Sequence, residues 1–132
     1  VISGEVEAVK RASELLKERG ARRVIPLKVS AAFHSPLMAE AAEAMKEEIE
    51  RVEFSEPRVP VIPCATAVPT KDPAELKEAL KNQLLAPVNW VKMMEAAKAE
   101  GVERFVEVGP GKVLQGLLKR IFPDAVIEGF GS

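Results

Sequence analysis

The sequence predicts an α/β fold with parallel strands. Two observations carry this prediction: short segments rich in β-branched and apolar residues alternate with segments whose apolar residues recur at helical spacing. Proline and glycine mark the boundaries between them. The 132 residues, 47% hydrophobic and 30% charged, suffice for one folded domain with a modest core. An alternating order of this kind is typical of parallel sheets crossed by helices.

The charge and cysteine content exclude several classes of protein. Nineteen basic and twenty acidic residues are interspersed and give a net charge of −1, so no nucleic-acid or membrane-surface partner is indicated. Cys64 is the single cysteine, which rules out an internal disulfide. The sequence has neither a bilayer-length apolar run nor a secretory signal pattern, and we expect a cytoplasmic location.

The first third of the chain is expected to run helix, strand, helix. Residues 5–19 place their apolar side chains on one helical stripe. Residues 22–29 are β-branched and apolar and predict a strand. Ser35 can cap a helix with its hydroxyl group, and Pro36 suits the first helical position. A helix should therefore follow and run to about Val52.

The remainder continues the alternation. Asp72 is a candidate cap for a helix whose first position is Pro73. The expected elements, in order, are a strand at 59–63 that ends at Cys64, a loop at 66–73, a helix to about Leu85, a helix at 88–100, a buried strand at 104–109, a helix that follows the sharp Gly-Pro-Gly-Lys turn, and a short strand in the tail 124–132.

His34 is the chain's only histidine and lies within the stretch VSAAFHSPLM, residues 29–38. The amide groups that begin a helix at Pro36 would keep its imidazole neutral, as a general base requires. The alternative is a loop histidine with a structural role. Position in the sequence does not decide between the two.

A general base needs a nucleophile. Ser35 is adjacent, but capping uses its hydroxyl group. Cys64 could pair with His34 in a Cys-His hydrolase, although a lone cysteine after an apolar strand is typical of a small core residue. No Gly-x-Ser-x-Gly sequence occurs. On the residues alone, the nucleophile of an acyl-transfer enzyme is missing from this chain.

Four runs of sequence carry a resemblance: VSAAFHSPLM, VEFSEPRVPVIPCATA, NQLLAPVNWV and RFVEVGPGKVLQGLLKRI. In this order and spacing they resemble the C-terminal half of the malonyl-CoA:acyl carrier protein transacylases, acyltransferases of fatty acid and polyketide synthesis. The resemblance implies an α/β-hydrolase-like large domain with an inserted ferredoxin-like small subdomain. Residues 1–29 would be the latter part of the small subdomain, and residues 30–132 the C-terminal part of the large domain.

The resemblance also implies a reaction, the transfer of malonyl from CoA to the phosphopantetheine thiol of acyl carrier protein. His34 matches the general base, a backbone carbonyl at Gln83 would orient it, and Phe33 would favour malonyl over larger acyl groups. The serine nucleophile would lie in a missing N-terminal segment, so we expect the partial chain to be inactive without that partner. The two thioesters are substrates, and no cofactor or metal is expected.

Two positions depart from the family's pattern. Cys64 stands where asparagine is common, and Asn89 stands where arginine is common. Both departures concern local hydrogen bonding near the site. Two alternatives stay open: a non-enzymatic fragment that binds carrier protein or acts as a scaffold, and a piece of a polyketide synthase acyltransferase domain.

Overall fold

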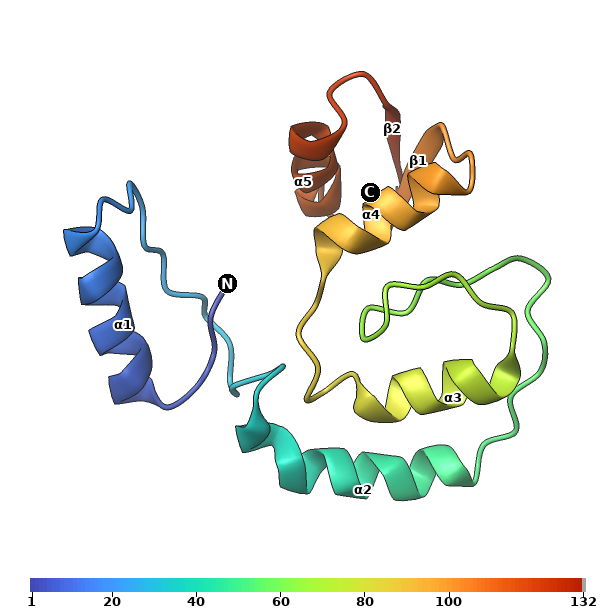
Figure 1. Cartoon of the computed structure of the whole chain (residues 1–132), viewed down its shortest axis with the longest axis horizontal. Coiled ribbons are helices and arrows are strands. Elements are labelled where there is room, and N and C mark those ends of the chain that lie inside the picture. Colours follow the sequence, from blue (N-terminus) through green and yellow to red (C-terminus); the bar gives the residue numbers. More distant parts are fainter. Residues whose placement is uncertain (132) are drawn as a thin grey trace.

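A computed structural model describes residues 1–131 of the chain, and Figure 1 shows how its elements are arranged. Helices and strands are mixed, and the C-terminal part alternates between them as the sequence predicts. The elements, in order, are α1 (Val6–Glu18), the 3-10 helix η1 (Pro36–Met38), α2 (Ala39–Glu50), α3 (Pro73–Asn82), α4 (Trp90–Ala99), β1 (Arg104–Val108), α5 (Val113–Ile121) and β2 (Val126–Phe130). Ser132, the last residue of the predicted tail, lies outside the described residues.

The predicted helix starts are confirmed. The Asp72 carboxylate accepts a hydrogen bond of 2.7 Å from the backbone N–H of Ala74 and so caps α3. Ser35 Oγ accepts a hydrogen bond of 3.3 Å from the backbone N–H of Leu37. The helix expected from Pro36 begins with the single 3-10 turn η1 and continues as α2.

The strands β1 and β2 pair in parallel, and α5 connects them. Phe105 pairs with Ile127 in this register, and the Phe105 ring stacks on Phe122 at 6.2 Å between centroids. Leu118 on α5 is 4% exposed, the lowest exposed fraction among the buried residues of this unit. A helix that crosses between parallel strands is the basic unit of an α/β fold. The prediction of parallel strands is therefore confirmed for this part of the chain.

Glu107 on β1 forms hydrogen bonds with the start of α5. Its carboxylate accepts hydrogen bonds from the backbone N–H groups of Leu114, at 3.0 Å, and Gln115, at 3.2 Å. Desolvation acts to raise the pKa of Glu107, but these donors outweigh it, and the pKa lies below that of an ordinary glutamate. The first turn of α5 thus has its free amide groups bound by an anion.

The other face of the two-stranded sheet is exposed, which corrects the expectation that residues 104–109 form a buried strand. Val106 is 50% exposed and Val108 is 77% exposed. Arg104 and Glu128 form an ion pair of 2.7 Å on the same side. The strand itself was correctly predicted, but no described element covers this face.

The prediction of a strand at residues 22–29 was wrong, since these residues have no regular secondary structure. The side chains of Ile25, Leu27 and Val29 are all more than 60% exposed. A strand is stable when its N–H and C=O groups pair with a neighbour, and nothing within residues 1–131 pairs with this segment. Pro26 also removes one donor.

The strand predicted at 59–63 reduces to one isolated antiparallel bridge. Val61 and Thr70 exchange two backbone hydrogen bonds of 2.9 Å each. Pro63, two residues after Val61, has no N–H group to donate to the partner strand, so the ladder cannot extend past Val61 in that direction. The segment nevertheless places Cys64 next to the end of α3, as described below.

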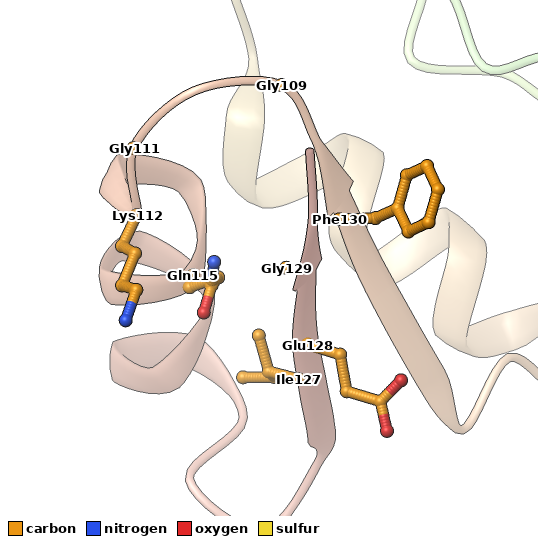
Figure 2. Close-up of a pocket in the computed structure, with 8 residues that line it drawn as sticks. All are labelled: Gly109, Gly111, Lys112, Gln115, Ile127, Glu128, Gly129 and Phe130. Atoms are coloured by element: carbon orange, nitrogen blue, oxygen red, sulfur yellow. The ribbon is translucent and has the colours of Figure 1, made fainter. Parts of the chain in front are cut away.

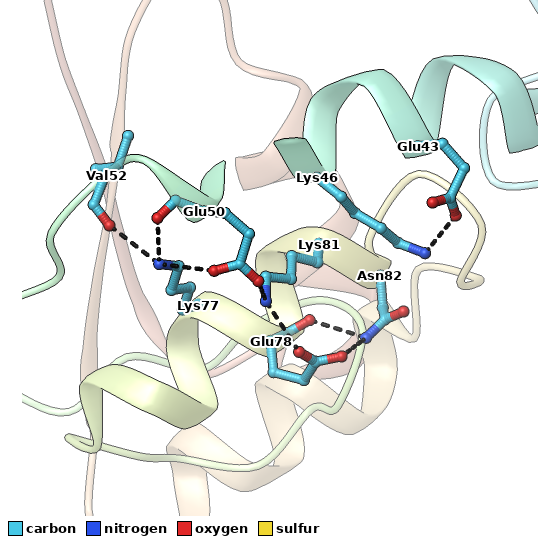
Figure 3. A network of polar contacts seen from close by, with 8 residues as sticks. All are labelled: Glu43, Lys46, Glu50, Val52, Lys77, Glu78, Lys81 and Asn82. Atoms are coloured by element: carbon cyan, nitrogen blue, oxygen red, sulfur yellow. Dashed lines mark hydrogen bonds and ion pairs between the residues drawn. The ribbon is translucent and has the colours of Figure 1, made fainter. Parts of the chain in front are cut away.

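The helices α2 and α3 run in opposite directions and pack together through Ala42, Ile49 and Ala79. Polar contacts reinforce the pair (Figure 3). Lys77 Nζ donates to the backbone carbonyl groups of Glu50, at 2.9 Å, and Val52, at 3.2 Å. Its ammonium group therefore binds carbonyls that are left unpaired at the end of α2.

Lys81 and Lys77 both bind the Glu50 carboxylate. The hydrogen bond from Lys81, followed by that from Lys77, holds the pKa of Glu50 below that of an ordinary glutamate. The same contact with Glu50 raises the pKa of Lys81. Figure 3 shows this cluster between the two helices, with the separate pair Lys46–Glu43 on α2 beside it.

Candidate functional site

His34 has a left-handed backbone conformation, with φ of 62°. Its backbone N–H donates a hydrogen bond of 2.9 Å to the carbonyl group of Leu84. A side chain at positive φ costs about 1–2 kcal/mol, although histidine tolerates this region better than most residues. Such a conformation persists where the surroundings hold it in place, and it is common at functional sites.

The His34 ring is fixed by two backbone carbonyl groups. Its Nδ1 atom lies 2.9 Å from the carbonyl oxygen of Gln83 and 2.9 Å from that of Ala86. Both partners are pure acceptors, so Nδ1 carries the proton and donates it. The lone pair of the neutral ring is then on Nε2. The structure thus brings together the two residues that the resemblance pairs, through the backbone of Gln83.

The carbonyl group of Gln83 has no donor within its own helix, because the residue four positions later is a proline. Gln83 is the C-terminal capping residue of α3, and the donor that would continue the helix to its carbonyl belongs to residue 87. That residue is Pro87, which has no N–H. The proline that ends the helix therefore also leaves an acceptor for His34.

His34 directly precedes Ser35, which caps the helix start at Pro36 as the sequence predicts. The hydrogen bonds of its ring are with carbonyl groups that follow α3. An imidazole that takes up a proton on Nε2 keeps both contacts, because Nδ1 remains a donor.

Ser35 does not serve His34 as a nucleophile. Its side chain is 5% exposed, and Oγ donates a hydrogen bond of 2.7 Å to the carbonyl group of Ala32 while it accepts one from Leu37. Both functions of the hydroxyl group are used in local structure. The capping role predicted for Ser35 agrees with this arrangement.

Cys64 reaches the site through the side chain of Gln83. Its Sγ donates to Gln83 Oε1 at 3.8 Å, and the two residues are half-buried. Among residues 1–131, His34 and Cys64 share no hydrogen bond, so the Cys-His pairing receives no support. Asn89, the other departure, precedes α4, and its carbonyl accepts from the Met93 N–H at 3.0 Å.

Phe33 is 40% exposed, so its ring is not a core aromatic of the described residues. It directly precedes His34, and its carbonyl group accepts a hydrogen bond of 2.7 Å from Ser3 Oγ. No pattern in the sequence predicts this contact or the contact of Ala86 with His34. Backbone carbonyls carry no residue-specific pattern, although Pro87 could have pointed to the free group at Gln83.

Two of the hollows formed by residues 1–131 differ in their relation to His34. A hollow of about 290 Å³ borders Gln83, and its lining is otherwise apolar: Phe54, Val61, Pro63, Leu76 and Leu80. A hollow of about 350 Å³ lies between α5 and β2 (Figure 2). There Gln115 Nε2 is buried, has no hydrogen-bond partner within residues 1–131 and faces Gly129, where a Cβ atom would lie 2.6 Å away. The residues that line the larger hollow lie between positions 109 and 130, and none of them belongs to the site around His34.

Residues 1–131 contain no group of three or more His, Cys, Asp or Glu side chains that could hold a metal ion. None of the described helices has both the length and the apolar character needed to cross a bilayer.

Comparisons with known proteins decide the family. The profile of the acyl transferase domain family matches residues 1–126. The chain belongs to this family. The malonyl CoA-acyl carrier protein transacylase of Bacillus subtilis is 47% identical over 121 residues, which are 92% of this chain and 38% of that protein. The protein of the same name from Synechocystis is 39% identical over the whole chain and 44% of its own length.

Solved structures agree. An acyl carrier protein S-malonyltransferase from Vibrio cholerae has a TM-score of 0.91 and 42% identity, covering 98% of this chain and 42% of that one. A malonyl-transacylase solved in complex with its type II polyketide synthase acyl-carrier protein has a TM-score of 0.88 and 36% identity. The match covers 98% of this chain and 41% of that one. The resemblance is confirmed, and the mixed helix and strand architecture matches these enzymes.

The chain spans about two fifths of the length of the relatives that it matches. The hydrolase-like description of the large domain and the division into residues 1–29 and 30–132 stay predictions.

Proposed function

We propose that this chain supplies the general base of a malonyl transferase, which moves malonyl from CoA to the phosphopantetheine thiol of acyl carrier protein. The observation that carries the proposal is the anchoring of His34 Nδ1 by two carbonyl groups, which leaves Nε2 as a base. The names of the acyltransferase relatives supply the reaction. No cofactor is required for such a transfer.

In the first half-reaction, His34 Nε2 takes the proton of a serine hydroxyl group as its oxygen attacks the malonyl thioester carbonyl. The C–O bond of a serine ester forms, the C–S bond breaks, and the imidazolium returns the proton to the CoA thiolate. The 132 residues contain no Gly-x-Ser-x-Gly sequence, so this serine comes from polypeptide outside them.

In the second half-reaction, Nε2 takes the proton of the phosphopantetheine thiol. The thiolate attacks the serine ester, the new thioester forms, and the released serine oxygen recovers the proton from His34. The carbonyl groups of Gln83 and Ala86 stay bound to Nδ1–H throughout and face the positive charge of the imidazolium. The same ring thus acts twice as base and twice as acid.

Phe33 is proposed to restrict the acyl group. A half-exposed ring next to the base would occupy the room that an added methyl group needs. Replacing it with a smaller residue, Phe33→Ser, should raise the ratio of methylmalonyl to malonyl transfer. An unchanged ratio of the two kcat/KM values would contradict this assignment.

A polyketide context is a second candidate, because one structural relative is a malonyl-transacylase bound to a polyketide synthase carrier protein. The chemistry at His34 would be the same in both contexts. The two candidates are separated by the carrier protein that accepts malonyl with the higher kcat/KM.

The test uses a chimera in which this chain replaces the matching part of the Bacillus subtilis relative, which supplies the rest of that protein. Malonyl transfer from malonyl-CoA to phosphopantetheinylated carrier protein is measured. His34→Ala should lower kcat by about 10²–10⁴-fold, the usual contribution of a general base.

Gln83→Ala is the matched control, since it removes the side chain and keeps the carbonyl group that binds His34. It should lower kcat by less than about 10-fold, because the orientation of the ring is retained. Full activity of His34→Ala would refute the proposal. Carrier-protein binding by the unaltered chimera without any transfer would favour the non-enzymatic alternative instead.

A further inference from the structure

We infer that Ser3 is a positioning residue for His34, an inference that rests on the proposed function. Ser3 Oγ donates a hydrogen bond of 2.7 Å to the carbonyl group of Phe33, 30 residues away. Figure 1 shows the N-terminal end of the chain, before α1, close to the segment that leads into η1. No other hydrogen bond of the Ser3 side chain is found in residues 1–131.

The carbonyl group that Ser3 binds belongs to the peptide unit between Phe33 and His34. The N–H group of the same unit is that of His34, and it donates to the Leu84 carbonyl at 2.9 Å. One peptide plane is therefore held at both of its polar ends, by segments far apart in the sequence. The orientation of this plane relative to the His34 Cα atom is what the angle φ describes.

Holding this plane maintains the left-handed conformation of His34. At φ of 62° the residue is in a sparsely populated region, and a free chain would return to negative φ. The direction of the Cα–Cβ bond relative to the preceding chain would then change, and Nδ1 would move away from Gln83 and Ala86. Ser3 thus acts on catalysis through the ring of His34, without touching substrate.

Ser13 provides a matched control. Its hydroxyl group donates to the backbone carbonyl of Val9 at 2.7 Å, the same kind of bond with the same length, but within α1 and without contact to the site. The pair Ser3→Thr and Ser3→Val provides a second control. The two side chains have nearly the same shape, and Thr alone keeps the hydroxyl donor.

The experiment uses the chimera described above, with kcat and KM for malonyl-CoA measured for Ser3→Ala, Ser3→Val, Ser3→Thr and Ser13→Ala. Ser3→Ala and Ser3→Val should lower kcat by about 3- to 10-fold and leave KM unchanged. This factor is the decrease in the population of correctly oriented His34 that the loss of one hydrogen bond would cause. Ser3→Thr should recover most of kcat. Ser13→Ala should match the unaltered chimera.

A spectroscopic readout separates positioning from a general loss of structure. The 15N resonances of the His34 ring, identified by their loss in His34→Ala, should report the Nδ1–H tautomer in the parent and in Ser3→Thr. Ser3→Val should shift them toward a mixture of tautomers, while thermal unfolding stays within a few degrees of the parent.

The outcomes are distinguishable. If His34→Ala is inactive but Ser3→Val keeps the kcat and the 15N resonances of the parent, the role of Ser3 is refuted and the proposed function stands. If His34→Ala is active, the proposed function fails and the role of Ser3 in catalysis fails with it. If kcat falls equally in Ser3→Thr and Ser3→Val, the hydroxyl group is not the cause and the inference is overturned.

Discussion

Two regions of the molecule are built on different principles. In the unit formed by β1, α5 and β2, side chains of one continuous segment, residues 104–130, hold the structure together, as in the stacking of Phe105 on Phe122. At His34, backbone carbonyl groups 49 and 52 residues away do so. The first region is encoded by residue types in a regular pattern. The second depends on how segments distant in the sequence meet. The groups that bind His34 there are backbone carbonyls, which every residue type carries.

The largest expected effect breaks the C-terminal unit. Leu118→Ala removes a side chain that is 4% exposed, and it should lower the free energy of unfolding by about 2–5 kcal/mol because the surroundings fill the cavity only in part. Urea denaturation of the chimera, followed by circular dichroism, measures this loss.

Leu114→Ala on the same helix is the control, since Leu114 is 44% exposed. It should cost less than half as much as Leu118→Ala. Equal losses for the two variants would mean that burial against the sheet is not what stabilises α5.

A smaller effect on stability tests the left-handed backbone conformation of His34. His34→Gly and His34→Ala both remove the imidazole, but glycine adopts φ of 62° without the penalty that alanine pays. The glycine variant should therefore be more stable by about 1 kcal/mol in thermal unfolding, while both are inactive. A more stable alanine variant would show that this conformation is not retained.

The sequence predicted the C-terminal unit well for a physical reason. The β-branched and apolar residues in 104–108, helical periodicity in 113–121 and the glycines between them are local signals, and the local structure agrees with them. The segment 22–29 also carries a strand signal, but it forms no ladder because a strand needs a partner, which composition does not reveal. The segment 59–63 has a partner at Thr70, and its proline content limits the pairing to one bridge.

The candidate site divides in the same way. His34, Gln83 and Phe33 could be named from the family resemblance, and the structure joins the first two through a backbone hydrogen bond. Their catalytic and selective roles stay predictions. The left-handed backbone of His34, the carbonyl group of Ala86 and the hydroxyl group of Ser3 could not be named, because each acts through the conformation of the main chain.

The smallest effect concerns the cluster that ties α3, and with it Gln83, to α2. Lys81 and Lys77 lower the pKa of Glu50, so the folded state binds a proton at Glu50 less readily than the unfolded state. The stabilisation is complete above the pKa of Glu50 in the unfolded chain and is lost as the pH falls through its lower folded value. Glu50→Gln should therefore be less stable than the parent at pH 7, and the difference should shrink in this acidic range.

Glu43→Gln is the matched control on the same helix. Glu43 pairs with Lys46 at 2.7 Å within α2, is 70% exposed, and makes no contact with α3 among the described hydrogen bonds and ion pairs. Its replacement should leave stability nearly unchanged at every pH, as is usual for an exposed ion pair. Thermal unfolding of the parent and both variants between pH 3 and pH 7 makes the comparison. If Glu50→Gln and Glu43→Gln behave alike, the ion pairs of the Glu50 carboxylate add nothing to the stability of the α2–α3 pair, which then rests on the packing of Ala42, Ile49 and Ala79 and on the bonds of Lys77 to the backbone carbonyl groups.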